Sequence, residues 1–184
     1  LEDDCLPNNA FFDFCSQMLD RYENSDQVMH ISGSRWNEEF KTGDSYLFSS
    51  IGHIWGWATW KRAWDKYDYN MADWGKHIPK IKIALQKPLY VGFWKELFQE
   101  VAVSNKKHTW DYQWQYTLFK EKGLAVVPDV NMILNIGPDG VHSNSSKQQR
   151  SVAEYTYDRK LNNWKLYKHP VTVIQNKMYD DYHM

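Results

Sequence analysis

The sequence predicts a single α/β domain in which helices flank a mixed sheet. Short apolar runs of the kind found in buried strands alternate with longer segments whose apolar residues recur at helical spacing. The chain has 184 residues, of which 42 % are hydrophobic, and this is enough for one sizeable core. No internal repeat, low-complexity tract or linker interrupts the sequence, so residues 1–184 are expected to form one domain.

The N-terminal part predicts a helix between short strands. Residues 1–7 are expected to be the end of a strand that turns into a helix, with acidic residues gathered at the turn. Apolar residues at helical spacing predict a helix over residues 11–22, with Asn8 or Asn9 as its N-cap. The next elements are expected to be a buried strand over 28–33, a polar surface loop over 35–44 and a short strand over 45–49.

The middle of the chain is predicted to be mainly helical. Helices are expected over residues 58–67, 79–87, 91–105 and 109–122. Pro88 separates the second of these from the third, since proline interrupts a helix interior. Gly123 would close the last of them as the C′ residue.

Strand-like runs return near the C-terminus. Strands are expected over residues 124–128 and 131–136, with a turn at 137–140. Residues 141–151 are polar and are expected to be mobile, with 144–151 as a lid. Residues 152–184 form a C-terminal extension, in which 170–174 could be an edge strand.

Charge and cysteine content exclude several classes of protein. Lys and Arg number 22 against 23 Asp and Glu, a net charge of −1, which argues against nucleic acid as a partner. Cys5 and Cys15 do not form a metal-binding spacing, so neither a zinc site nor a disulfide framework is expected. A reducing, cytoplasmic location is the resulting expectation. No apolar run approaches the roughly 18–20 residues of a membrane span.

Aromatic residues are unusually frequent, with 10 Trp, 12 Tyr and 8 Phe. Two explanations stay open at this point. The aromatic rings could form a densely packed core, or some of them could be platforms on which sugar rings stack.

Several short motifs follow one another in an order that is more informative than any one of them. They are Glu2-Asp3-Asp4, Phe11-Phe12, His30-Ile31-Ser32-Gly33, Gly56-Trp57-Ala58-Thr59-Trp60, Trp110-Asp111 and Gly137-Pro138-Asp139-Gly140-Val141-His142-Ser143. Over roughly residues 1–145 this order resembles bacterial nucleotide-diphospho-sugar transferases of the GT-A fold. It is most similar to the hemolytic-protein-like transferases of polysaccharide clusters, and more distantly similar to the N-acetylglucosaminyltransferase I family.

The resemblance implies that the chain is the C-terminal half of a GT-A fold. The N-terminal half, which binds the nucleotide, would then be absent, and the fragment would be inactive alone. Its first strand would lack neighbours, so that pairing with a second copy into a homodimer is an expectation.

The resemblance makes Asp4 the ligand of a Mn²⁺ or Mg²⁺ ion that carries the diphosphate of the donor. Glu2 and Asp3 would contact the sugar, the ribose or metal-bound water. The alternative is a solvated acidic turn, or carboxylates that interact favourably with the helix dipole.

Asp111 is the candidate catalytic base, because it matches the Trp-Asp position of the family. Apolar neighbours such as Trp110 would raise the pKa of Asp111 toward a useful value. The alternative is structural, since an Asp in the first turn of a helix is favoured by the helix dipole.

Two further segments are candidates for sugar binding. Trp55, Gly56 and Trp57 would form the floor of the donor or acceptor sugar site, where Gly56 lets a ligand approach the backbone. His142 and Ser143 would belong to the lid that closes over the donor. The alternatives are core packing for each Trp and a surface loop without a ligand for the lid.

The expected function is therefore metal-dependent transfer of a sugar, with inversion, from a nucleotide-diphosphate sugar to a glycan or lipid-linked saccharide. A lipid-linked acceptor would bring the enzyme to the periphery of a membrane. The alternative is a non-catalytic carbohydrate-binding or dimerisation module.

Overall fold

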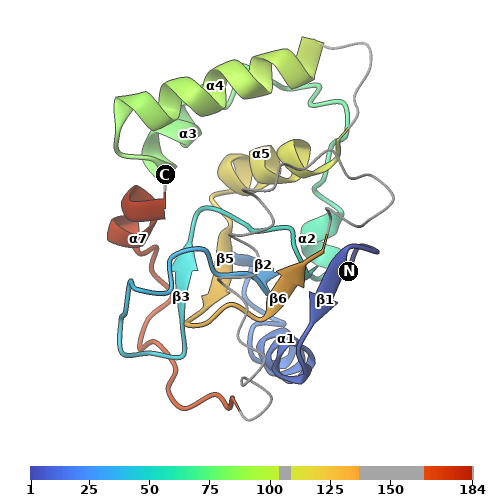
Figure 1. Cartoon of the computed structure of the whole chain (residues 1–184). Helices are drawn as coiled ribbons and strands as arrows, with labels where there is room; N and C mark the ends of the chain where they lie inside the picture. Colours follow the sequence, from blue (N-terminus) through green and yellow to red (C-terminus); the bar gives the residue numbers. More distant parts are fainter. Residues whose placement is uncertain (104–108, 137–163, 184) are drawn as a thin grey trace.

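The structure is a computed structural model that describes residues 1–103, 109–136 and 164–183. Its centre is a four-stranded mixed sheet in the order β3-β5-β2-β4, of which Figure 1 labels β3, β5 and β2. Strands β2 (Val28–Ser32) and β5 (Leu124–Pro128) are parallel, whereas β3 (Tyr46–Ser49) and β4 (Trp57–Ala58) join the two outer edges antiparallel. Every residue of β2, β3 and β5 is buried, as expected for strands covered on both faces.

A second, two-stranded sheet pairs β1 (Cys5–Pro7) with β6 (Ile133–Asn135) in antiparallel register. The acidic residues 2–4 thus lie just before a strand, not at the end of one as predicted. They adjoin the end of β6, where the N–H of Ile136 donates to the Asp4 carbonyl at 2.7 Å. The homodimer was expected because the first strand would lack a neighbour. Since β1 pairs with β6 in the same chain, that reason does not apply, and the homodimer stays a prediction.

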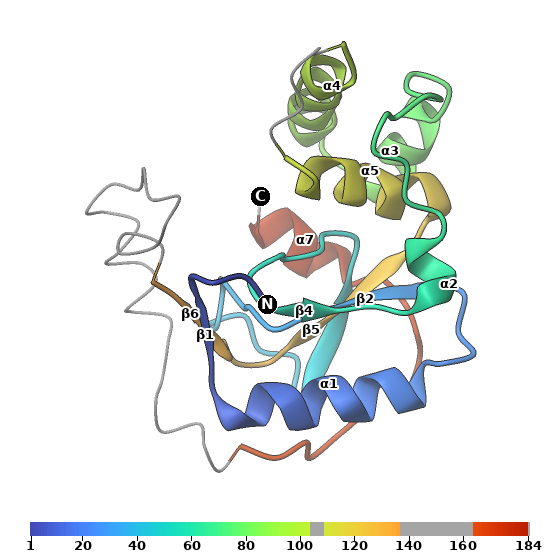
Figure 2. The same ribbon diagram turned by 90° about the vertical axis from the view of Figure 1, so that its right-hand side faces the viewer.

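Helices cover both faces of the central sheet. They are α1 (Asn9–Arg21), α2 (Lys61–Trp64), α3 (Ile78–Ala84), α4 (Pro88–Val103), α5 (Asp111–Glu121) and α7 (Lys177–His183). Figure 2 shows α1 along one face of the sheet and α5 over the other, with α3 and α4 forming a further layer beyond α5. The predicted mixed sheet flanked by helices is confirmed.

Helix α1 forms for the reasons read from the sequence. Its N-cap is Asn8, whose side-chain oxygen accepts a hydrogen bond of 3.1 Å from the backbone N–H of Phe11. Its apolar face buries Phe11, Phe14 and Met18 in the core together with the strands. The helix therefore lies where its hydrophobic spacing predicts.

The helix predicted over residues 58–67 is largely wrong. Trp57 and Ala58 are extended and pair with Ser32 and Ile31 of β2, and a helix begins only at Lys61. The conformation of β4 is determined by its pairing with β2. The hydrogen bonds of the sheet therefore outweigh the local helical pattern.

Pro88 separates α3 from α4 as expected, but two details of the helix ends differ from the expectations. Pro88 is the first residue of α4, where its missing N–H costs nothing. At the end of α5 it is Lys122, with φ of 55°, that has the left-handed conformation expected of Gly123. Gly123 is needed for a different reason, since a Cβ there would lie 2.4 Å from the sulfur of Met29.

Residues 164–183, which lie in the expected C-terminal extension, pack against the core of the domain. No strand forms over 170–174; a single bridge joins Gln175 to Phe48 of β3. Asp180 of α7 is buried and accepts hydrogen bonds from the hydroxyl groups of Ser49 and Ser50, at 2.5 and 2.8 Å. These bonds anchor the C-terminal helix to the end of β3. The predicted turn at 137–140 and the lid at 144–151 lie outside the described residues.

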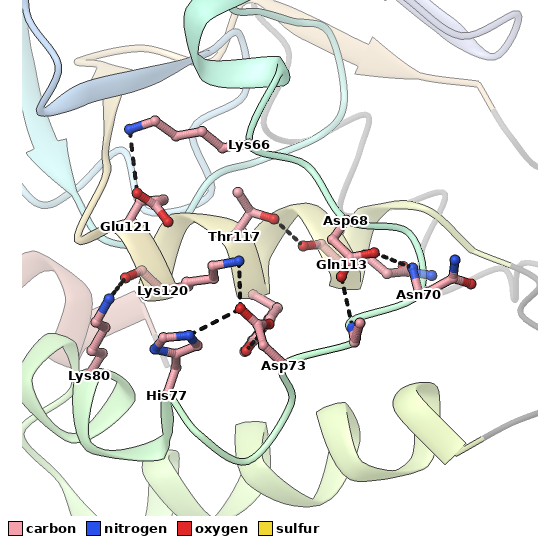
Figure 3. Close-up of polar contacts among 12 residues, drawn as sticks. Lys66, Asp68, Asn70, Asp73, His77, Lys80, Gln113, Thr117, Lys120 and Glu121 are labelled. Atoms are coloured by element: carbon pink, nitrogen blue, oxygen red, sulfur yellow. Dashed lines mark hydrogen bonds and ion pairs between the residues drawn. The ribbon is translucent and has the colours of Figure 1, made fainter.

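A network of polar contacts attaches the 65–77 segment to α5 (Figure 3). The Asp73 carboxylate accepts a hydrogen bond of 2.9 Å from the Tyr116 hydroxyl and lies 2.7 Å from Nζ of Lys120. His77 contacts the same carboxylate at 3.1 Å. Burial raises the pKa of Asp73, but the bonds from Lys120 and Tyr116 together lower it to about 2.

Replacing Asp73 should therefore destabilise the fold at pH values above those at which an ordinary Asp titrates. We expect Asp73→Asn to lower the free energy of unfolding by roughly 1 kcal/mol at neutral pH, a modest value because solvent screens the half-buried pair. The contribution of Asp73 is complete above the unfolded pKa of about 3.9 and is lost as pH falls toward 2.

Urea unfolding at pH 7 and at pH 3 measures this difference. Asp65→Asn is the matched control, because Asp65 pairs with Lys61 on the exposed surface and should cost little. Equal losses in the two variants would contradict the role assigned to Asp73.

Candidate active site

Three potential metal-ligating side chains meet at the N-terminus. One ligand atom from each of Glu2, Asp4 and Cys5 lies within 4.8 Å of the others. Asp4 is held in place on both oxygens, by the Cys5 thiol at 3.5 Å and by the Asn135 side-chain amide at 3.4 Å. Asp3 is exposed and is not part of this group.

Two of the three side chains, the carboxylates of Glu2 and Asp4, are of the kind that binds a hard cation. Burial and the nearby Asp4 raise the pKa of Cys5 to about 11, so the thiol stays protonated and is a poor ligand at neutral pH. Burial and then the Asp4 charge raise the pKa of Glu2. A divalent cation would offset this repulsion between carboxylates, and oxygen ligands are those that Mg²⁺ and Mn²⁺ prefer.

The start of α5 lies beside this carboxylate pair. The Glu2 carboxylate interacts with the side chain of Trp110, whose hydrogen bond lowers its pKa, and with the charge of Asp111, which raises it. More than 100 positions separate these segments in the sequence. The structure thus brings Glu2, Asp4, Trp110 and Asp111 into one region.

Asp111 has the environment that a proton acceptor needs. Its Oδ1 atom is buried and has no hydrogen-bond partner among the described residues. Burial raises the pKa of Asp111, and backbone N–H groups at the helix start oppose this only in part. A carboxylate with a raised pKa and an uncommitted oxygen can take a proton from a hydroxyl group.

Trp57 is engaged in packing, which is the alternative stated for it from the sequence. Its ring stacks on His30 at a centroid distance of 5.1 Å and on Trp110 at 5.2 Å. His30 is fully buried within β2, where its Nδ1 accepts a hydrogen bond from Trp114 and its Nε2 donates to the His53 carbonyl. This stack of rings fixes the position of Trp110 beside Glu2.

Gly56 is also required by packing. Its φ is +60°, and a Cβ there would lie 2.4 Å from the side chain of Ile133 and 3.3 Å from that of Leu1. A close approach to Gly56 therefore exists, and the group that makes it in the structure is the Ile133 side chain of β6.

Trp55 lies in a different environment from Trp57. It lines a pocket of about 130 Å³ together with Trp36, His53, Trp94, Asp111 and Tyr112. Asp111 thus has the carboxylate pair nearby and also forms part of the wall of an aromatic pocket. His142 and Ser143 lie outside the described residues.

Sequence reasoning missed Trp36 and Trp94 as members of this region, and it placed His30 in a motif without giving it a role there. Trp36 was assigned to a surface loop and Trp94 to a helix without a site role, because neither belongs to a recognisable motif. The one available signal was the excess of aromatic residues, which does not say which rings meet.

Comparison with known protein families, with curated proteins and with solved structures gives no significant match. Among the described residues, no helix is both long enough and apolar enough to cross a membrane.

The buried state of His30 predicts a specific loss of stability in mild acid. Burial lowers the pKa of His30 to about 4, although its bond to the His53 carbonyl opposes this. Since an unfolded His binds a proton near pH 6.5, stability should fall as pH decreases from about 6.5 to 4, by up to about 3 kcal/mol.

Urea unfolding of wild type and His30→Gln across this pH range measures the effect. The variant is expected to be less stable at pH 7 but to lose less stability on acidification, because Gln takes up no proton. Parallel curves for the two proteins, or an imidazole that titrates near pH 6.5 by NMR, would contradict the assignment.

Proposed function

We propose that the protein is a metal-dependent glycosyltransferase of the GT-A type, transferring a sugar from a nucleotide-diphosphate donor to a saccharide. The observation that supports this most directly is the meeting of Glu2 and Asp4 with Asp111 from segments far apart in the sequence. Sugar transfer needs these two chemical functions in one place: carboxylates for a cation and a separate base. The order of motifs that resembles the family supports the same reading.

The residues divide the work as follows under this proposal. Asp4 and Glu2 would hold Mn²⁺ or Mg²⁺, which supplies positive charge to neutralise the departing diphosphate. Asp111 would accept the proton of the attacking hydroxyl group, which strengthens the nucleophile as the anomeric bond breaks. The stacked rings of His30, Trp57 and Trp110 would fix the position of the base relative to the carboxylates that hold the cation.

A non-catalytic carbohydrate-binding module is the second candidate. The aromatic pocket beside Asp111 favours it, since such a pocket could hold a sugar without any transfer. The two candidates differ in what they require of Asp4 and Asp111.

Asp4→Asn should weaken Mn²⁺ binding at least about tenfold, given that even indirect partners of a metal contribute 10–100-fold. Titration of the chain with Mn²⁺ alone, followed by electron paramagnetic resonance of the free ion, measures this. Asp13→Asn, which removes an exposed carboxylate from α1, is the matched control and should leave binding unchanged. Equal binding by Asp4→Asn and wild type would rule out the metal site.

Asp111→Asn should leave Mn²⁺ binding intact and lower the rate of transfer by about 10²–10⁴, the usual contribution of a general base. The assay follows nucleotide release from a panel of sugar nucleotides in the full-length protein, in the presence of saccharide acceptors. A folded Asp111→Asn variant that transfers within a few-fold of wild type would show that another group is the base.

A further inference from the structure

We infer that the pocket lined by Trp36, Trp55, Trp94 and Asp111 binds a single pyranose ring of a saccharide. Three Trp side chains and that of Tyr112 line it, together with Asp111 and several smaller groups. Its assignment as the acceptor site rests on the proposed function, whereas the binding of a sugar ring there does not. Four lines of observation support it.

The first is a pair of buried polar atoms without partners. Among the described residues, Nε1 of Trp94 and Oδ1 of Asp111 are buried and make no hydrogen bond. Trp94 is only 9 % exposed, so its N–H group is removed from bulk water. A buried polar group left unsatisfied destabilises the folded state, and both groups belong to residues that line this pocket.

The two atoms are chemically complementary to a carbohydrate. An indole nitrogen donates a hydrogen bond and never accepts one, whereas a carboxylate oxygen accepts. A sugar hydroxyl group does both, so neighbouring hydroxyl groups on one ring can satisfy Trp94 and Asp111 together. A purely apolar ligand would leave both unsatisfied.

The second line is that Gln115, another polar side chain in the wall, is already used. Its oxygen accepts from the Gly52 N–H at 2.9 Å and its nitrogen donates to the Ser50 carbonyl at 2.8 Å. Gln115 therefore fixes the 50–52 segment, of which Ile51 and Gly52 line the pocket. With Gln115 engaged in this way, Trp94 and Asp111 are lining residues that each keep a buried polar atom without a partner among the described residues.

The third line is the arrangement of Trp36 and Trp55. Their ring centroids lie 4.4 Å apart with the planes at 45°, too close for another ring to enter between them. Both side chains are half-buried, so part of each ring surface stays accessible. They form one continuous apolar wall against which the C–H face of a pyranose can lie, as in other pockets that combine aromatic walls with few polar groups.

The fourth line is size and position. The volume of about 130 Å³ is well below the roughly 300–1,000 Å³ of pockets for drug-sized ligands, so one ring enters and the rest of a saccharide stays outside. A hydroxyl group of that ring would lie against Asp111, whose charge also reaches Glu2. An acceptor hydroxyl needs this position if it is to be deprotonated beside the donor.

Saturation-transfer NMR on the chain with methyl α- and β-D-hexopyranosides at millimolar concentration tests this inference. We expect binding by wild type, and about tenfold weaker binding by Trp94→Phe, which keeps the ring but loses the N–H group. Trp36→Ala should weaken binding as much, and Trp36→Phe should restore part of it. Trp74→Phe is the matched control. It also removes an indole N–H group, but that group donates to Gln99 of α4, and Trp74 does not line the pocket.

Absence of binding to wild type, or wild-type affinity in both Trp94→Phe and Trp36→Ala, would overturn the inference. Mn²⁺ binding by the same variants reports separately on the proposed function. Sugar binding that persists in Asp4→Asn, together with absent Mn²⁺ binding in wild type, would overturn the transferase and leave the sugar site standing. Normal Mn²⁺ binding without sugar binding would overturn the sugar site and leave the proposed metal site standing.

Discussion

The hydrogen bonds of His30 are the interaction on which the rest of the site depends. His30 lies in β2, accepts from Trp114 of α5 at 3.0 Å and bonds the His53 carbonyl at 2.9 Å. Because Nδ1 accepts, the proton of the neutral ring lies on Nε2 and points to that carbonyl. One buried imidazole thus joins the central sheet, the helix above it and the loop that leads to Trp55 and Trp57.

This connection explains how Asp111 comes to face two different environments. The His30 ring stacks on Trp57, and Trp57 stacks on Trp110, the residue before Asp111. The start of α5 is thereby fixed relative to β4 and to the N-terminal carboxylates. On the other side, the 50–54 segment held by His30 and Gln115 closes the aromatic pocket.

Local patterns predicted those parts of the fold whose stability is decided locally. Helix α1 and strands β2 and β5 were found because capping by Asn8 and continuous apolar runs are properties of short segments. Strand β4 was missed because two residues of β2 define it. Arg35 was assigned to a surface loop, yet it is buried with its guanidinium on the carbonyl groups of Pro128 and Asn37 and over the Tyr179 ring.

The residues of the candidate site likewise fall into those that the sequence predicted and those that it could not. Motif order selected Glu2, Asp4, Trp110 and Asp111, and the structure brings these residues together. Motifs could not separate Trp55 from Trp57, since the two differ only in what surrounds them after folding. Trp57 is stacked against His30 and Trp110, whereas Trp55 lies beside Trp36 in the pocket wall. Such differences arise from contacts between distant segments, which a single sequence does not record.

The placement of Asp111 also limits how a transfer reaction could proceed. A base must lie on the acceptor side of the reacting carbon, and the cation must lie on the side of the departing diphosphate, if attack is to come from the opposite face. Glu2 is close enough to Asp111 for their charges to interact, so a cation at Glu2 and Asp4 would also favour the ionised form of Asp111. Burial acts in the opposite direction and raises its pKa. The proton affinity of Asp111 would therefore fall when the cation binds and rise when it leaves, so the ionisation of Asp111 would depend on whether the cation is bound.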